Sequence, residues 1–128
     1  MSAMSDFLEL EVLDHVLGTG SYTMPTTVRI GLSTGSFGDD NSGTELSGSG
    51  YARQAITFAA ASSGSAVTNG TVTFPTATGS WGSVANWGIF DAASGGNLLI
   101  HGAFATPKTI TSGDVLRINS GDLTVTAA

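Results

Sequence analysis

Residues 26–33, TTVRIGLS, decide the fold class, because apolar and other residues alternate there as they do in a β-strand. Val28, Ile30 and Leu32 fall on one side of this predicted strand. The stretch YARQAITF, residues 51–58, alternates in the same way. Further short strands are expected at residues 71–74, 86–92, 98–104, 115–119 and 123–126. The pattern therefore predicts a mainly β protein.

Turn-forming segments such as SSGS, NG, SGGN and SGD lie between these strands. Short strands with turn signals about every eight to twelve residues favour a sandwich or barrel. A chain of 128 residues is the length of one domain. We expect a single β-sandwich or jelly-roll-like domain over residues 6–128, preceded by an N-terminal tail at residues 1–5.

One α-helix is expected near the N-terminus, at about residues 6–17. Asp6 and Glu9 have the spacing of a capping box, and Gly18 suits the position after the last turn. The apolar residues form two adjacent ridges. The first ridge is Leu10, Leu13 and Leu17, and the second is Leu8, Val12 and Val16.

This apolar arc is wider than one sheet face needs. One interpretation is a helix that is well buried in its own domain. The other is a helix that packs on its own sheet with one ridge and on a neighbouring subunit with the other. On the second interpretation we expect a homo-oligomer, a trimer, with Leu8, Val12 and Val16 as partner contacts.

The composition excludes several classes of partner and site. The chain has no cysteine, so disulfides and thiolate zinc sites are absent. Ten acidic residues face four basic ones, and those four are scattered singly, so we expect binding to neither nucleic acid nor a membrane surface. The first ten residues do not resemble a signal peptide, and we expect no membrane span. So few charges suit a protein that sits in an assembly.

Residues 35–50 form a predicted loop, rich in Gly, Ser, Asp and Asn, that is longer than most connections in compact domains. A loop of this length either contacts a partner or is mobile in solvent. We predict the first, with contacts from Phe37, Asp39, Asp40 and Leu46. The alternative for Phe37 is a side chain that folds back on the domain's own core.

The same loop is a candidate metal site, because Asp39, Asp40, Asn41 and Glu45 offer hard oxygen ligands. An EF-hand loop that began at Asp39 would need an oxygen ligand at its fifth position and Glu at its twelfth. Those positions hold Gly43 and Gly50. We therefore predict no metal and no other cofactor, with an irregular calcium site as the alternative.

No catalytic motif is apparent, so we expect no enzyme. His15 and His101 fall in a helix and a strand, and Asp91 and Asp114 fall at predicted turns, where Asp is common for backbone reasons. The aromatic residues allow two interpretations, a sandwich core or a platform for sugar stacking, and we favour the core. They are Trp81, Trp87, Phe90 and Phe104.

Three ordered blocks carry a family resemblance: GYAR at residues 50–53, the WG…WGIFDA…GGNLL block at residues 81–99, and the two SGD turns. With them, residues 7–126 resemble small bacteriophage virion proteins that are commonly labelled tail-fibre or phage structural proteins. The resemblance implies a non-enzymatic structural protein of the virion, made in the host bacterial cytoplasm, with capsid or tail subunits as its partners. It implies no catalytic residues.

The position in the particle has two interpretations. Fibres that span distance usually carry coiled-coil or repeated shafts, which this chain lacks, so we expect a capsid decoration, or cement, protein. The alternative is a tail or tail-fibre component that takes part in host attachment. A carbohydrate-binding module that uses Trp81 or Trp87 is the third possibility, from another functional class.

Overall fold

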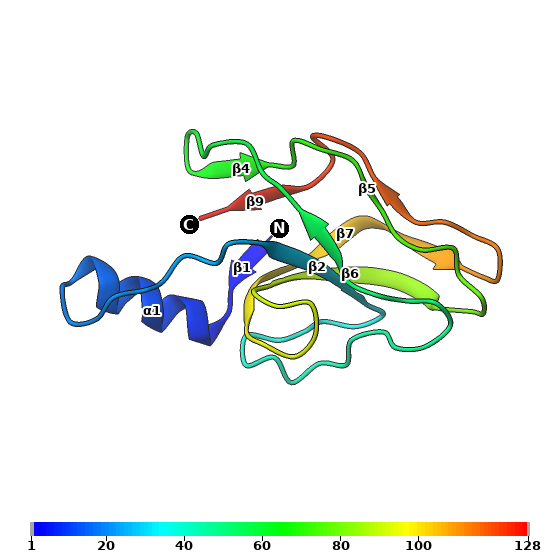
Figure 1. Cartoon of the computed structure of the whole chain (residues 1–128), viewed down its shortest axis with the longest axis horizontal. Coiled ribbons are helices and arrows are strands. Elements are labelled where there is room, and N and C mark those ends of the chain that lie inside the picture. The colour runs from blue at the N-terminus through cyan, green and yellow to red at the C-terminus, as the bar shows by residue number, and fades with distance from the viewer. Residues whose placement is uncertain (1, 128) are drawn as a thin grey trace.

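The computed structural model describes residues 2–127. They form one helix and nine strands (Figure 1). The elements are β1 (Ser2–Met4), α1 (Asp6–Val16), β2 (Val28–Ser33), β3 (Gln54–Ile56), β4 (Ser65–Val67), β5 (Val72–Thr73), β6 (Gly82–Phe90), β7 (Leu98–Ile110), β8 (Arg117–Ile118) and β9 (Thr124–Thr126). The prediction of a mainly β protein with one N-terminal helix is confirmed.

Five strands form one antiparallel sheet in the order β1-β7-β6-β2-β3. Two small antiparallel ladders, β4 with β9 and β5 with β8, lie over one face of this sheet (Figure 1). The main core fills the space between the sheet and the ladders, and Leu32, Trp87 and Ile118 are all buried in it. This layering is consistent with the expected sandwich.

The other face of the sheet is covered by loops. Gly31 of β2 pairs with Gly88 of β6, and the absence of two side chains leaves room there for rings. A Cβ atom at Gly88 would lie 3.1 Å from the ring of Phe90 and 3.2 Å from the ring of Phe37. Phe37 reaches this face from the 35–50 loop, so the central strands are covered on both sides.

Several strands differ from the predictions in their bounds, and β6 begins at Gly82, four residues before the expected start at residue 86. Residues 2–4 do not form a tail: they form β1, which pairs with Ile100, His101 and Gly102 of β7. β4 was not predicted at all, and β7 continues six residues past the expected end at residue 104, to Ile110. Residues 35–50 contain no strand, as expected.

The helix has the predicted bounds but a different cap. Ser5, not Asp6, is the N-cap: its hydroxyl accepts a hydrogen bond from the Leu8 backbone N–H at 3.2 Å and donates one to the Leu98 carbonyl. Because Ser5 is buried, this second bond fixes the start of the helix to β7. The helix ends at Val16, before Gly18, whose φ of +78° suits the chain reversal.

Helix α1 projects sideways from the body of the protein (Figure 1). Leu8 is its only buried residue. Val12 is half-buried, whereas Val16 is 72% exposed. The interpretation of a helix well buried in its own domain is therefore wrong.

Candidate functional site

The helix and the segment that returns from it form a projecting unit, residues 6–25, which we call the arm. Hydrogen bonds tie its two limbs together. The carbonyl of Asp14 accepts from the backbone N–H groups of Thr19 and Gly20 at 2.9 and 3.0 Å. The Thr19 hydroxyl donates to Asp14 Oδ1 at 2.9 Å, and the Tyr22 N–H donates to His15 Nδ1 at 3.2 Å. The arm is therefore a structured element and not a loose extension.

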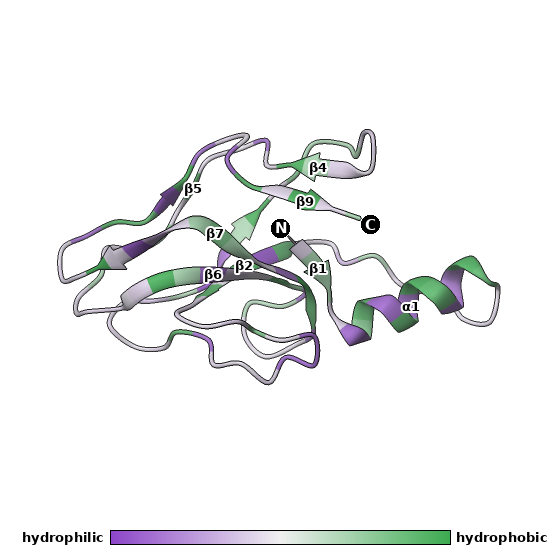
Figure 2. Ribbon diagram, turned by 180° about the vertical axis from the view of Figure 1, so that it is seen from behind, coloured by the Kyte–Doolittle hydropathy of each residue, from purple (hydrophilic) through white to green (hydrophobic). Residues whose placement is uncertain are grey.

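The arm carries most of the exposed apolar side chains of the protein. Within residues 2–127, seven large hydrophobic residues are exposed, and five of them lie between residues 10 and 24. They are Leu10 (64% exposed), Leu13 (55%), Val16 (72%), Leu17 (70%) and Met24 (79%). Figure 2 shows this hydrophobic character along α1, away from the body. Such a concentration is typical of an interaction surface.

Four of these residues share one side of the helix. At about 100° per residue, Leu10, Leu13, Val16 and Leu17 fall within an arc of about 120°, and we call these four residues the ridge. The exposed carboxylates of Asp6 and Glu9 fall within the same arc, in the first turn of the helix. Leu8, which packs on the body, lies about 140° from the centre of that arc. The ridge therefore points away from the protein's own core.

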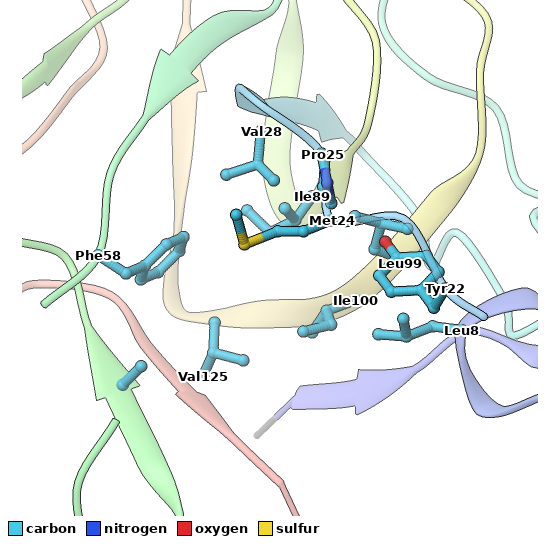
Figure 3. Close-up of a pocket in the computed structure, with 11 residues that line it drawn as sticks. Leu8, Tyr22, Met24, Pro25, Val28, Phe58, Ile89, Leu99, Ile100 and Val125 are labelled. Atoms are coloured by element: carbon cyan, nitrogen blue, oxygen red, sulfur yellow. The ribbon is translucent and has the colours of Figure 1, made fainter. Parts of the chain in front are cut away.

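An apolar cavity of about 340 Å³ opens at the root of the arm (Figure 3). The arm supplies part of its lining, the sheet supplies a second part, and the segment before β4, β4 itself and β9 supply the rest. The lining residues are Leu8, Tyr22, Met24, Pro25, Val28, Phe58, Ala66, Ile89, Leu99, Ile100 and Val125. Burial, and then the nearby charges of Asp91 and Glu11, raise the pKa of Tyr22, so its phenol is neutral at physiological pH. The cavity therefore has an uncharged lining.

The 35–50 loop packs on its own domain. Phe37 is 1% exposed and lies edge-to-face against Phe90, with ring centroids 5.5 Å apart. Leu98 completes this second core cluster. The structure thus places Phe37 in the core, which was the alternative interpretation, and its side chain is not available to a partner. Leu46 is half-buried against the main core, and its N–H donates to the Leu32 carbonyl at 2.9 Å.

The GYAR block holds this loop in place through Arg53. Its guanidinium donates two hydrogen bonds to the carboxylate of Glu45, at 2.9 and 2.7 Å. It also donates to the carbonyls of Ala92 and Gly95, at 2.9 and 2.8 Å. The Arg53 side chain is only 7% exposed, so these bonds form largely out of water. Arg53 therefore fastens the 35–50 loop to the turn after β6.

Tyr51 completes the same network. Its hydroxyl donates to Glu45 and accepts a hydrogen bond from the Leu32 N–H at 2.9 Å. Burial, and then the hydrogen bond to Glu45, raise the pKa of Tyr51 far above its usual range. Because Arg53, Glu45 and Tyr51 make these contacts with one another and with the backbone, the network is a structural clamp.

Two predicted contact residues, Asp39 and Asp40, are exposed. Asp39 Oδ1 lies 2.7 Å from His101 Nε2, and hydrogen bonds from Ser42 lower the pKa of Asp40. Carboxylate oxygens of Asp6, Glu9 and Asp39 lie within 4.8 Å of one another. Exposed acidic groups of this kind occur commonly without an ion, and we assign no metal to them.

The other candidate polar residues serve local structure. Asp91 accepts a hydrogen bond from the Asn97 N–H at 2.7 Å, and Asp114 accepts one from the Thr111 N–H at 2.8 Å. Trp81 and Trp87 are 5% and 2% exposed and belong to the main core. The interpretation of these two indoles as a sugar-stacking platform is therefore wrong. Within residues 2–127, no helix is long and apolar enough to cross a membrane.

The cavity was not predicted from the sequence. Its lining comes from segments as distant in the chain as residues 8 and 125, and residues 18–25 show no periodicity that would mark Tyr22 or Met24 as part of a site. The Arg53–Glu45 pair was missed for a similar reason, because two charged residues in neighbouring loops give no spacing signal. The one usable signal for an interaction surface was the wide apolar arc predicted for the helix, which lies on the arm.

Comparison with known proteins identifies one family. The family described as "Podophage GP4 fiber I protein gp80" matches residues 3–126. No curated protein matches the chain. Because the family match spans nearly the whole sequence, the chain belongs to this fibre-protein family of bacteriophage structural proteins. This description favours a tail fibre, which was the alternative prediction, over capsid decoration.

Proposed function

We propose that this member of a podophage fibre family is a non-enzymatic building block of a virion fibre. The observation that carries the proposal is the family match, which runs from β1 to the end of β9 and so includes the whole folded body. The fold supports a mechanical role, because the sheet is covered on both faces and the clamp around Arg53 fixes the longest loop. The protein is made in the host cytoplasm and then becomes part of the virion.

The test is localisation of the protein on the phage that encodes it. Gold-labelled antibody raised against the purified chain should bind at the tail region. Label spread over the capsid faces would instead favour a decoration protein. As a second readout, particles that lack the chain should retain full heads and lose fibre density.

The proposal includes self-association as a homotrimer. It is supported by the ridge, because burying an exposed Leu or Val side chain fully in an interface stabilises the assembly by about 1.5–3 kcal/mol. Among the partner contacts predicted from the sequence, Val16 lies in the ridge and Asp39 and Asp40 lie on the accessible surface. Val12 and Leu46 are half-buried, and Leu8 and Phe37 are buried. We therefore retain Val16, Asp39 and Asp40 as contact residues.

A further inference from the structure

The protein carries a projecting apolar ridge and an uncharged apolar cavity on the same chain. We propose that the ridge of one copy seats in the cavity of a second copy, so that copies join head to tail through two different surfaces. This inference rests on the self-association proposed above and specifies its contact. The second copy supplies the side chains that complete the cavity.

The ridge cannot fill the cavity of its own chain. Leu8 lines the cavity, and the ridge lies on another side of the helix, about 140° away. The hydrogen bonds of Asp14 and His15 hold the two limbs of the arm together, and Ser5 fixes its base. A ridge that points outward on a structured arm is available to another molecule at little cost in ordering.

The sizes agree. An engineered protein cavity of about 150 Å³, lined by Leu, Ile and Phe, accepts a benzene molecule. A cavity of about 340 Å³ therefore has room for about two side chains of the size of Leu or Val. The ridge offers four such side chains, so two can enter while the others pack on the rim beside Met24.

The charge favours a contact of this kind between copies. Each copy has a net charge of −6, so two copies repel each other through most of their surface. The cavity lining has no charged residue. A contact made through Leu13, Val16 and Leu17, which lie beyond the first-turn carboxylates of Asp6 and Glu9, keeps the repulsion between two acidic copies low. Because ridge and cavity differ, the contact is heterologous, and closure after three copies gives a ring-shaped trimer.

Single substitutions test each half of the contact. Leu13→Glu alters the ridge and Met24→Glu alters the mouth of the cavity, and both positions are exposed, so the fold should survive. Val115→Glu is the matched control, since Val115 is also an exposed apolar residue but lies just before β8, outside both surfaces. By light scattering, the first two variants should associate at least about tenfold more weakly, and the control should match the unsubstituted protein.

Mixing the two variants is decisive. In a head-to-tail contact, the intact ridge of Met24→Glu can enter the intact cavity of Leu13→Glu, so two monomeric variants should form a 1:1 pair. Ala66→Phe fills the cavity from β4, so we expect this variant to be monomeric alone and to pair with Leu13→Glu, as Met24→Glu does. Its melting curve checks that it folds. Failure of the mixtures to pair would overturn the inference, as would normal association of Ala66→Phe, because ridges would then pack on each other. A fibre location with a monomeric chain would refute both this contact and the proposed self-association, and would leave the assignment to a fibre standing.

Discussion

The guanidinium carbon of Arg53 lies 3.6 Å from the centroid of the Phe90 ring. This stacking joins the clamp to the second core cluster, because Phe90 also packs against Phe37. One arginine thus connects the last residue of β6 to the carboxylate of Glu45 and, through it, to the 35–50 loop. The loop is therefore an integral cover of the sheet.

Arg53→Ala should destabilise the fold by about 3 kcal/mol, because removing one partner of a buried pair leaves the other charge unpaired. The stacking on Phe90 would be lost as well. Urea denaturation measures the change. The matched control is Arg117→Ala, which removes an exposed arginine and should change stability by less than about 0.5 kcal/mol. Equal effects from the two substitutions would mean that the clamp contributes nothing beyond a surface charge.

Phe37→Ala should cost about 3–5 kcal/mol, the range for a phenylalanine removed from a core. The sequence predicted that Phe37 contacts a partner, and its burial against Phe90 places it in the protein's own core instead. Ser47→Ala, an exposed position in the same loop, is the control and should be nearly neutral. Melting curves decide the question: an unchanged midpoint for Phe37→Ala would show that the loop does not cover the sheet.

The pKa of Tyr51 is raised by its burial and by its hydrogen bond to Glu45, which gives a pH dependence of known sign. In the unfolded chain Tyr51 ionises near pH 10, whereas in the folded protein it stays protonated. The free energy of unfolding is therefore unaffected by Tyr51 ionisation below pH 10. Above pH 10 it falls by up to about 1.4 kcal/mol per pH unit, because only the unfolded chain ionises there.

Denaturation of the protein and of Tyr51→Phe between pH 8 and pH 11 measures this dependence. The substituted protein should be less stable at pH 8, because Glu45 and the Leu32 N–H each lose a partner. It should also lose stability less steeply above pH 10. Parallel curves for the two proteins would mean that a group other than Tyr51 causes the loss of stability at high pH.

Calcium should not change the stability. The carboxylates of Asp6, Glu9 and Asp39 are exposed, and Asp39 is already engaged with His101. Melting curves with EDTA and with excess calcium should therefore superimpose. A ligand at a hundred times its dissociation constant adds about 2.7 kcal/mol, so real binding would raise the midpoint by several degrees. The variant Glu9→Gln would then show whether this cluster is responsible.

The strands that the sequence predicted are those with a buried side. In β2, Ile30 and Leu32 alternate because they face the main core, and this pattern is visible without a structure. β1 and β4 have three residues each, too few to establish a period, and their conformation follows from pairing with β7 and β9. Their positions could be found only from the tertiary structure.

The helix also combines features that the local sequence predicts with features that only the tertiary structure determines. Its bounds depend on local signals, a polar cap and a following glycine, and they were predictable to within a residue. How much of it is buried depends on where the arm lies relative to the body, and no local pattern encodes that. Phe37 illustrates the point for the loop, because the space that its ring occupies depends on Gly88, in a strand that is distant in the sequence.

A cryo-EM map of the intact phage is the most direct test of the fibre assignment and of the role of the arm. Density for this fold is expected in a fibre at the tail, with Leu13 and Val16 of each copy covered by a neighbouring subunit. Density for the fold on the capsid surface would contradict the assignment to a fibre. A fibre in which these two side chains face solvent would contradict the role given to the arm.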